Sequence, residues 1–152
     1  MTGFKQMRTT VLKQLQIYTM SKSMLVHYDE RGLHGRSTAP GVTTSGHADP
    51  TAKDALFHIE ADERLSAMRT WVQAIEQAYA YFEERDVDKA RLMQRLYGLN
   101  GCKPAPGDIR YCSRLNRSFH VSEATLYRWR EDIVQAVMAA AIALGTLSPF
   151  EQ

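Results

Sequence analysis

The chain has 152 residues, of which 44% are hydrophobic and 24% are charged, and its formal net charge is +2. These are ordinary globular values, and the length favours one domain, or one small domain with an extended arm. The longest purely apolar run, Ala136–Leu144, is too short to cross a bilayer, and no apolar segment of a secretory signal follows the first residues. We therefore expect a cytoplasmic protein without membrane contact.

The cysteines and histidines do not form a recognisable metal or catalytic site. Cys102 and Cys112 lack the close pairing of a zinc site, and only His120 is near them, so we expect reduced thiols, no metal and no cofactor. No histidine falls in an acid–base or nucleophile pattern with Cys, Ser or Asp, which argues against an enzyme. The histidines considered are His27, His34, His47, His58 and His120.

The N-terminal half predicts two helices joined by a loop. Apolar residues at steps of three and four predict a helix over Phe4–Tyr28, uninterrupted by Pro or Gly. Residues 30–48 are rich in Gly, Ser and Thr and predict a flexible loop. Asp49 followed by Pro50 is a strong helix start, and this second helix should reach about Glu84.

The second half of that helix carries a heptad seam. Its apolar residues follow steps of 3, 4, 3, 4 and 3 and are Leu65, Met68, Val72, Ile75, Tyr79 and Phe82. The seam could pack on the first helix within one chain, or pair with a second subunit to form a homodimer through the N-terminal helices. The spacing fits both arrangements.

Three further helices follow, and no stretch predicts a strand. Asp86 should cap a helix over Val87–Tyr97 that ends at Gly98. After an Asn100–Gly107 loop, Asp108 should open a helix to about Ser118. A tight turn then leads into a long helix from Glu123 to about Leu144. The expected fold is all-α, with a helical arm over 1–84 and a C-terminal helix-turn-helix domain over 85–152.

The segment Asp108–Arg130 fits a helix-turn-helix that reads DNA. It lies within a basic stretch from Lys103 to Arg130, in which six cations oppose two carboxylates. Apolar residues supply a small core for two steeply crossing helices: Tyr111, Leu115, Phe119, Val121, Leu126 and Trp129. Ser122 is suited to cap the second helix, with Val121 and Leu126 as its hydrophobic staple. A plain corner of a helical bundle is the structural alternative.

Position in the second helix assigns roles to its side chains. With a recognition helix over about 122–133, Glu123, Ala124 and Arg128 are placed to reach base edges in the major groove. The residues expected to hold phosphates are Ser122, Thr125, Tyr127, Arg130, Arg110, Arg114 and Arg117.

The stretch Ser122–Arg130, SEATLYRWR, resembles the recognition helix of small phage transcriptional regulators of the RinA and ArpU type. Further similarity lies in Arg36-Ser-Thr, in Asp49-Pro-Thr-Ala and in Leu96-Tyr97, so the resemblance spans Gly35–Leu144. It implies a helix-turn-helix similar to region 4 of sigma factors, and an activator of phage or prophage late genes in a bacterial host cell. Double-stranded DNA is the implied partner, with RNA polymerase as a candidate second one.

Two positions depart from that pattern. His120 stands where the turn usually has Gly, and histidine tolerates a positive φ better than most residues. Asn116 stands where the first helix usually has Ala, and its amide needs a hydrogen-bond partner.

Two other functions fit the same residues. One is the DNA-recognition subunit of a phage packaging machine, similar to a small terminase subunit, although in that class the DNA-binding motif commonly precedes the oligomerising helices. The other is a helical interaction protein without DNA.

Overall fold

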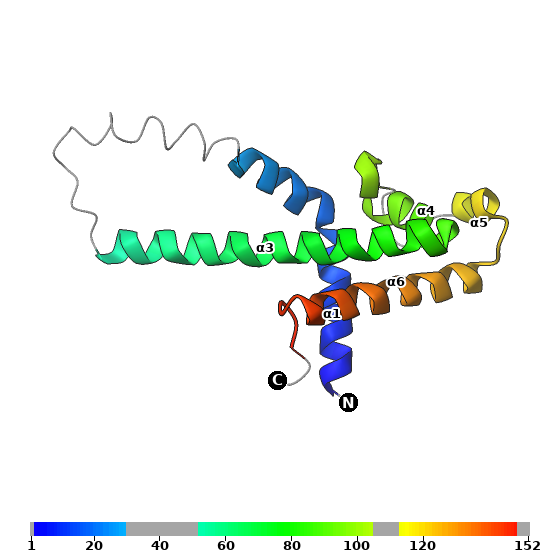
Figure 1. The fold of residues 1–152 in the computed structure, drawn as a ribbon. Helices are drawn as coiled ribbons and strands as arrows, with labels where there is room; N and C mark the ends of the chain where they lie inside the picture. Colours follow the sequence, from blue (N-terminus) through cyan, green and yellow to red (C-terminus); the bar gives the residue numbers. More distant parts are fainter. Residues whose placement is uncertain (1, 30–51, 105–112, 149–152) are drawn as a thin grey trace. The chain divides into compact units, whose positions relative to one another are not determined.

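The computed structural model describes residues 2–29, 52–104 and 113–148. Every regular element in these ranges is helical, and residues 18–29 are helical in addition to the labelled elements (Figure 1). The all-α prediction is confirmed. The labelled helices are α1 (Thr2–Gln16), α3 (Ala52–Arg85), α4 (Val87–Tyr97), α5 (Ser113–Phe119) and α6 (Glu123–Ala143), and the short 3₁₀ helix η2 (Leu99–Gly101) follows α4.

Several predicted features lie outside the described residues. They are the loop over 30–48, the helix start at Asp49 and the helix start at Asp108.

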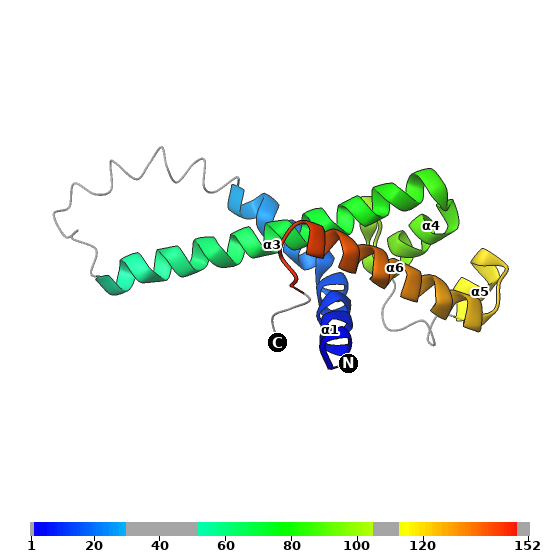
Figure 2. The same ribbon diagram turned by 60° about the horizontal axis from the view of Figure 1, so that its bottom comes forward.

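Packing divides the chain into two compact units, one formed by Met1–Thr19 with Thr70–Gln152 and the other by Met20–Arg69. This division differs from the sequence division near residue 84, because α1 and the second half of α3 supply core residues to the C-terminal helices. In the larger unit α1 packs across α6 (Figure 2). The fully buried side chains at its centre include Val11, Leu15, Ile75, Leu92, Met93, Ile133 and Val137.

From Val72 to Phe82 the heptad seam packs within the chain. Val72, Ile75, Tyr79 and Phe82 are all buried in the larger unit. The Tyr79 hydroxyl accepts a hydrogen bond from Gln94 Nε2 of α4 at 2.5 Å, which ties α3 to α4. No helix among the described residues is both long and apolar enough to cross a membrane.

The smaller unit pairs residues 20–29 with the first half of α3. Leu25 is buried in this unit, and Arg69 donates two hydrogen bonds to Asp29, at 2.8 and 3.0 Å. These bonds lower the pKa of the exposed Asp29 carboxyl. Tyr28 donates a longer bond to Asp62 at 3.5 Å.

The expectation of one uninterrupted helix over Phe4–Tyr28 is wrong at Ile17. The helix begins at Thr2, breaks at Ile17 and resumes at residue 18. No Gly or Pro signals the break, so local propensity does not explain it. The residues just after it are held by tertiary contacts: Tyr18 donates to Glu76 at 2.9 Å, and Thr19 lies against Gly98.

The predicted ends of α4 are confirmed. Asp86 accepts a hydrogen bond from the Lys89 backbone N–H, and Gly98 ends the helix in the left-handed region with φ 81°. The predicted Asn100–Gly107 loop needs correction, because its first residues belong to η2. Asn100, with φ 58°, is a residue type that enters this region more readily than most.

An ion pair joins α1 to α6. Arg8 Nε donates to both carboxylate oxygens of Glu131, at 2.9 and 3.1 Å, and a second nitrogen also contacts that carboxylate. These hydrogen bonds outweigh burial and hold the pKa of Glu131 below its ordinary value of 4.5. Both side chains are about a third exposed, at 32% and 37%.

Arg8→Met is expected to lower the free energy of unfolding at neutral pH by less than about 1 kcal/mol, because solvent screens this pair. A pKa that is depressed on folding stabilises the fold above pH 4.5, and that contribution is lost as pH falls through the folded value. Urea unfolding at descending pH should therefore show the deficit of the variant shrinking in acid. Lys5→Met, an exposed position on α1, is the control. A deficit independent of pH would contradict this assignment.

Candidate nucleic-acid interface

The turn between α5 and α6 contains a histidine whose backbone is in the left-handed region. His120 directly follows α5 and has φ 55°. The next residue, Val121, donates its backbone N–H to Asn116 O at 3.3 Å and so closes the end of α5. Helices make this hydrogen bond at their C-terminal end when the next residue is in the left-handed region. Gly usually occupies that position. The sequence expectation that His120 permits the turn is met by this conformation.

The start of α6 is fixed by Ser122. Its hydroxyl accepts a hydrogen bond from the Thr125 backbone N–H at 3.2 Å, and the two side-chain oxygens lie 3.0 Å apart. The predicted N-cap is therefore confirmed. At its other end α6 closes at Gly145, where Gly145 and Thr146 donate to the carbonyls of Ile142 and Ala141.

An apolar cluster holds the two helices of the corner. Leu115 of α5 and Leu126 of α6 are 5% and 0% exposed. Phe119 meets Trp129 edge to face, with ring centroids 5.9 Å apart. Aromatic pairs in this arrangement stabilise by about 1 kcal/mol beyond the area they bury. Tyr111, the remaining predicted core aromatic, lies outside the described residues.

The side-chain oxygen of Asn116 is buried and has no hydrogen-bond partner among the residues that the structure describes. A buried carbonyl in this state costs free energy relative to the alanine that the resembled regulators usually carry there. The corner thus forms although this residue is unfavourable to it.

The residues predicted to read bases lie on the exposed surface of α6. Glu123 and Ala124 occupy its first turn and are exposed, and Arg128 follows one turn later. A guanidinium nitrogen of Arg128 donates to Thr125 Oγ1 at 3.3 Å, which ties this side chain to the first turn of the helix. The three base-reading candidates therefore share an accessible end of one capped helix.

The predicted phosphate contacts are only partly described. On α6, Ser122 is exposed, while Thr125, Tyr127 and Arg130 are half-buried, and Arg130 lies over the Tyr127 ring at 5.0 Å. On α5, Arg117 is exposed. Arg110 and the side chain of Arg114 lie outside the described residues.

Two acidic residues near the end of the recognition helix are neutralised from other helices. Glu131 is paired with Arg8 of α1, and Asp132 accepts from Lys89 of α4 at 2.9 Å. Burial by itself would lower the pKa of Lys89, but its hydrogen bonds to Asp132 and Asp86 outweigh burial and raise it. These pairs reduce the repulsion that two carboxylates on α6 would exert on a phosphate backbone.

One cation at this corner was not among the residues predicted from the sequence to contact DNA. Arg91 of α4 lies over the face of Phe119, with its guanidinium carbon 5.2 Å from the ring centroid. Arg91 precedes the basic stretch counted from Lys103, so the charge count did not include it. The spacing of Arg91 and Arg95, four residues apart on a predicted helix, is the signal that could have drawn attention to this face.

Comparison with known proteins identifies no relative. No protein-family model, curated protein or solved structure matches this chain. The likeness to the RinA and ArpU regulators therefore depends on the quoted residues alone.

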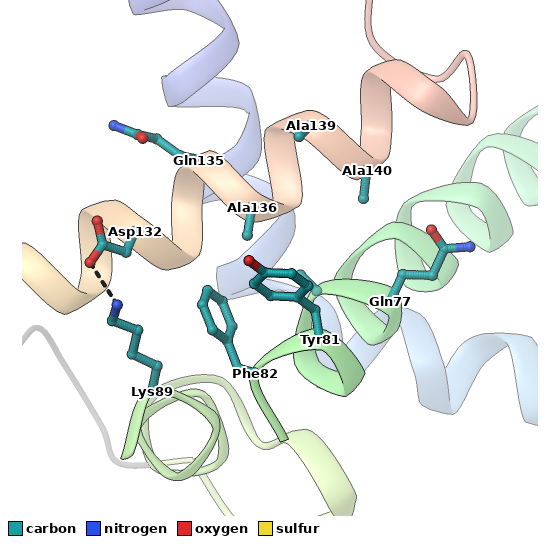
Figure 3. Close-up of a pocket in the computed structure, with 10 residues that line it drawn as sticks. Gln77, Tyr81, Phe82, Lys89, Asp132, Gln135, Ala136, Ala139 and Ala140 are labelled. Carbon is teal, nitrogen blue, oxygen red and sulfur yellow. Dashed lines mark ion pairs between the residues drawn. The ribbon is translucent and has the colours of Figure 1, made fainter. Parts of the chain in front are cut away.

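A groove of about 680 Å³ lies between α3, α4 and α6 (Figure 3). The rings of Tyr81 and Phe82 face alanines of α6 across it, and the Lys89–Asp132 ion pair lies at one end. The groove thus combines aromatic and alanine surface with this paired charge and with the glutamines Gln77 and Gln135. Its lining consists of Gln77, Ala78, Tyr81, Phe82, Lys89, Asp132, Gln135, Ala136, Ala139 and Ala140.

Proposed function

We propose that this protein is a sequence-specific double-stranded DNA-binding regulator whose recognition helix is the N-terminal half of α6. The observation that carries the proposal is the capped, exposed start of α6, which presents Glu123, Ala124 and Arg128 together on a corner fixed by packing. Helix-turn-helix proteins enter the major groove with this end of their second helix. The resemblance of Ser122–Arg130 supports a more specific proposal, a regulator of phage or prophage genes in the host cytoplasm that acts on promoters beside RNA polymerase.

Each side chain has a chemical role in this proposal. Arg128 donates two hydrogen bonds to the O6 and N7 atoms of guanine, and Glu123 accepts from a cytosine amine. Ala124 packs on a thymine methyl group. The residues that hold the phosphate backbone are Ser122, Thr125, Tyr127, Arg130, Arg110, Arg114 and Arg117.

Arg128→Ala is expected to weaken binding to the selected site by about 1–3 kcal/mol and to relax the preference at one base pair. Selection of bound sequences from random DNA defines the site, and gel shifts on that site and on random DNA compare the two affinities. Arg64→Ala, an exposed arginine on the first half of α3, is the control and should change neither affinity. An equal loss on specific and random DNA would refute the base-reading role of Arg128.

A further inference from the structure

Helix α4 places a positively charged side chain at the corner between α5 and α6. Arg91 of α4 stacks over Phe119, the last residue of α5, and that ring also meets Trp129 of α6. Half of the Arg91 side chain stays exposed, so donors of its guanidinium remain accessible. Its ion-pair partner among the described residues is Asp88, at the long distance of 4.0 Å. A stacked guanidinium with a weak acidic partner is well prepared to bind another anion.

Arg95 extends this charge along α4. It is exposed and lies four residues after Arg91, so both arginines occupy one face of the helix. On α6, Glu131 is paired with Arg8 and Asp132 with Lys89, while Glu123 stays exposed in the first turn. Arg91 and Arg95 therefore add two exposed cations to α4, against the one carboxylate of Asp88, and the basic stretch from Lys103 does not include them.

We propose that Arg91 and Arg95 bind the phosphate backbone of DNA on the flank of the site that α6 reads. The inference rests on the proposed DNA binding and widens its contact surface from α5 and α6 to α4. Guanidinium groups match phosphate oxygens with paired hydrogen bonds, and stacking on Phe119 limits the freedom that Arg91 loses on binding. Phosphate contacts add affinity without sequence preference, so this face strengthens binding to every DNA.

The test is fluorescence anisotropy of a labelled DNA duplex over a series of salt concentrations, with the full chain. Arg91→Gln and Arg95→Gln are each expected to weaken binding about fivefold on specific and random DNA alike, and to reduce the salt slope by about 1. Arg91→Lys keeps the charge and should keep the slope. Arg85→Gln is the matched control, because Arg85 also stacks on an aromatic ring, Tyr81 at 4.5 Å, but lies on α3. It should leave both affinity and slope unchanged.

The outcomes separate this inference from the proposed function. If the unaltered chain binds no DNA under any salt condition, the proposed function fails and the inference fails with it. If the chain binds DNA but Arg91→Gln and Arg95→Gln retain its affinity and salt slope, only the α4 contact is refuted. Altered base preference in both Arg91→Gln and Arg91→Lys would also overturn the phosphate contact, because it would show that Arg91 positions the corner through Phe119.

Discussion

Gly98→Ala is expected to lower the free energy of unfolding by about 3 kcal/mol, because alanine meets both strain and a clash at this position. Gly98 ends α4 with φ 81°, a conformation that side chains rarely adopt. A Cβ atom there would lie 2.9 Å from the backbone oxygen of Cys102 and against the Thr19 methyl group. The Thr19 side chain can turn away, but the Cys102 carbonyl can move only if the backbone that follows η2 shifts with it.

Gly145 provides a control with the same backbone angle. Its φ is also 81°, and no atom lies within 4 Å of an added Cβ. Gly145→Ala should therefore show the conformational cost alone, about 1 kcal/mol. Urea unfolding followed by circular dichroism would measure both variants. Equal losses would show that the close contact of Gly98 with Cys102 and Thr19 contributes nothing to stability.

Leu126→Ala is expected to cost about 3 kcal/mol of stability by leaving a cavity under the start of α6. Leu126 is fully buried at the α5–α6 corner, where Leu115 is also buried. Removing its side chain deletes apolar contacts that the surrounding helices cannot replace by small shifts. The same unfolding experiment would report the loss as a lower denaturant midpoint.

A conservative substitution shows whether the loss of stability comes from the missing side-chain volume or from any change at Leu126. Leu126→Met retains nearly the same volume and should cost less than about 1.5 kcal/mol. It should also retain DNA affinity, since α6 keeps its support. If alanine cost less than methionine, Leu126 would not anchor the recognition helix.

Most helix boundaries followed from the sequence because capping is local. Asp86, Gly98 and Ser122 each act on backbone groups within four residues of themselves, so their chemistry could be interpreted without a fold. The exposed N-terminal end of α6 could be predicted for the same reason, because it depends on residues that are close in the sequence. The break at Ile17 could not be predicted, because no local residue signals it and the contacts that hold the following residues come from α3 and from Gly98.

The heptad seam shows that a sequence pattern can predict an apolar helix surface without predicting which helix packs against it. Its spacing requires an apolar surface to cover it, and a helix of the same chain or of a second subunit satisfies that requirement equally. Packing inside the larger unit covers the seam from Val72 to Phe82 within the chain, while Leu65 and Met68 lie in the smaller unit and stay partly exposed.

The sequence by itself determined the helical class, the caps of α4 and α6 and the residues exposed at the start of α6, since each depends on neighbours in the chain. Only the tertiary structure decided which distant charges meet. Arg8 neutralises Glu131 across 123 positions, Lys89 neutralises Asp132, and Arg91 reaches Phe119. Electrostatic interactions depend on distance in space, and no periodicity in the sequence encodes that distance.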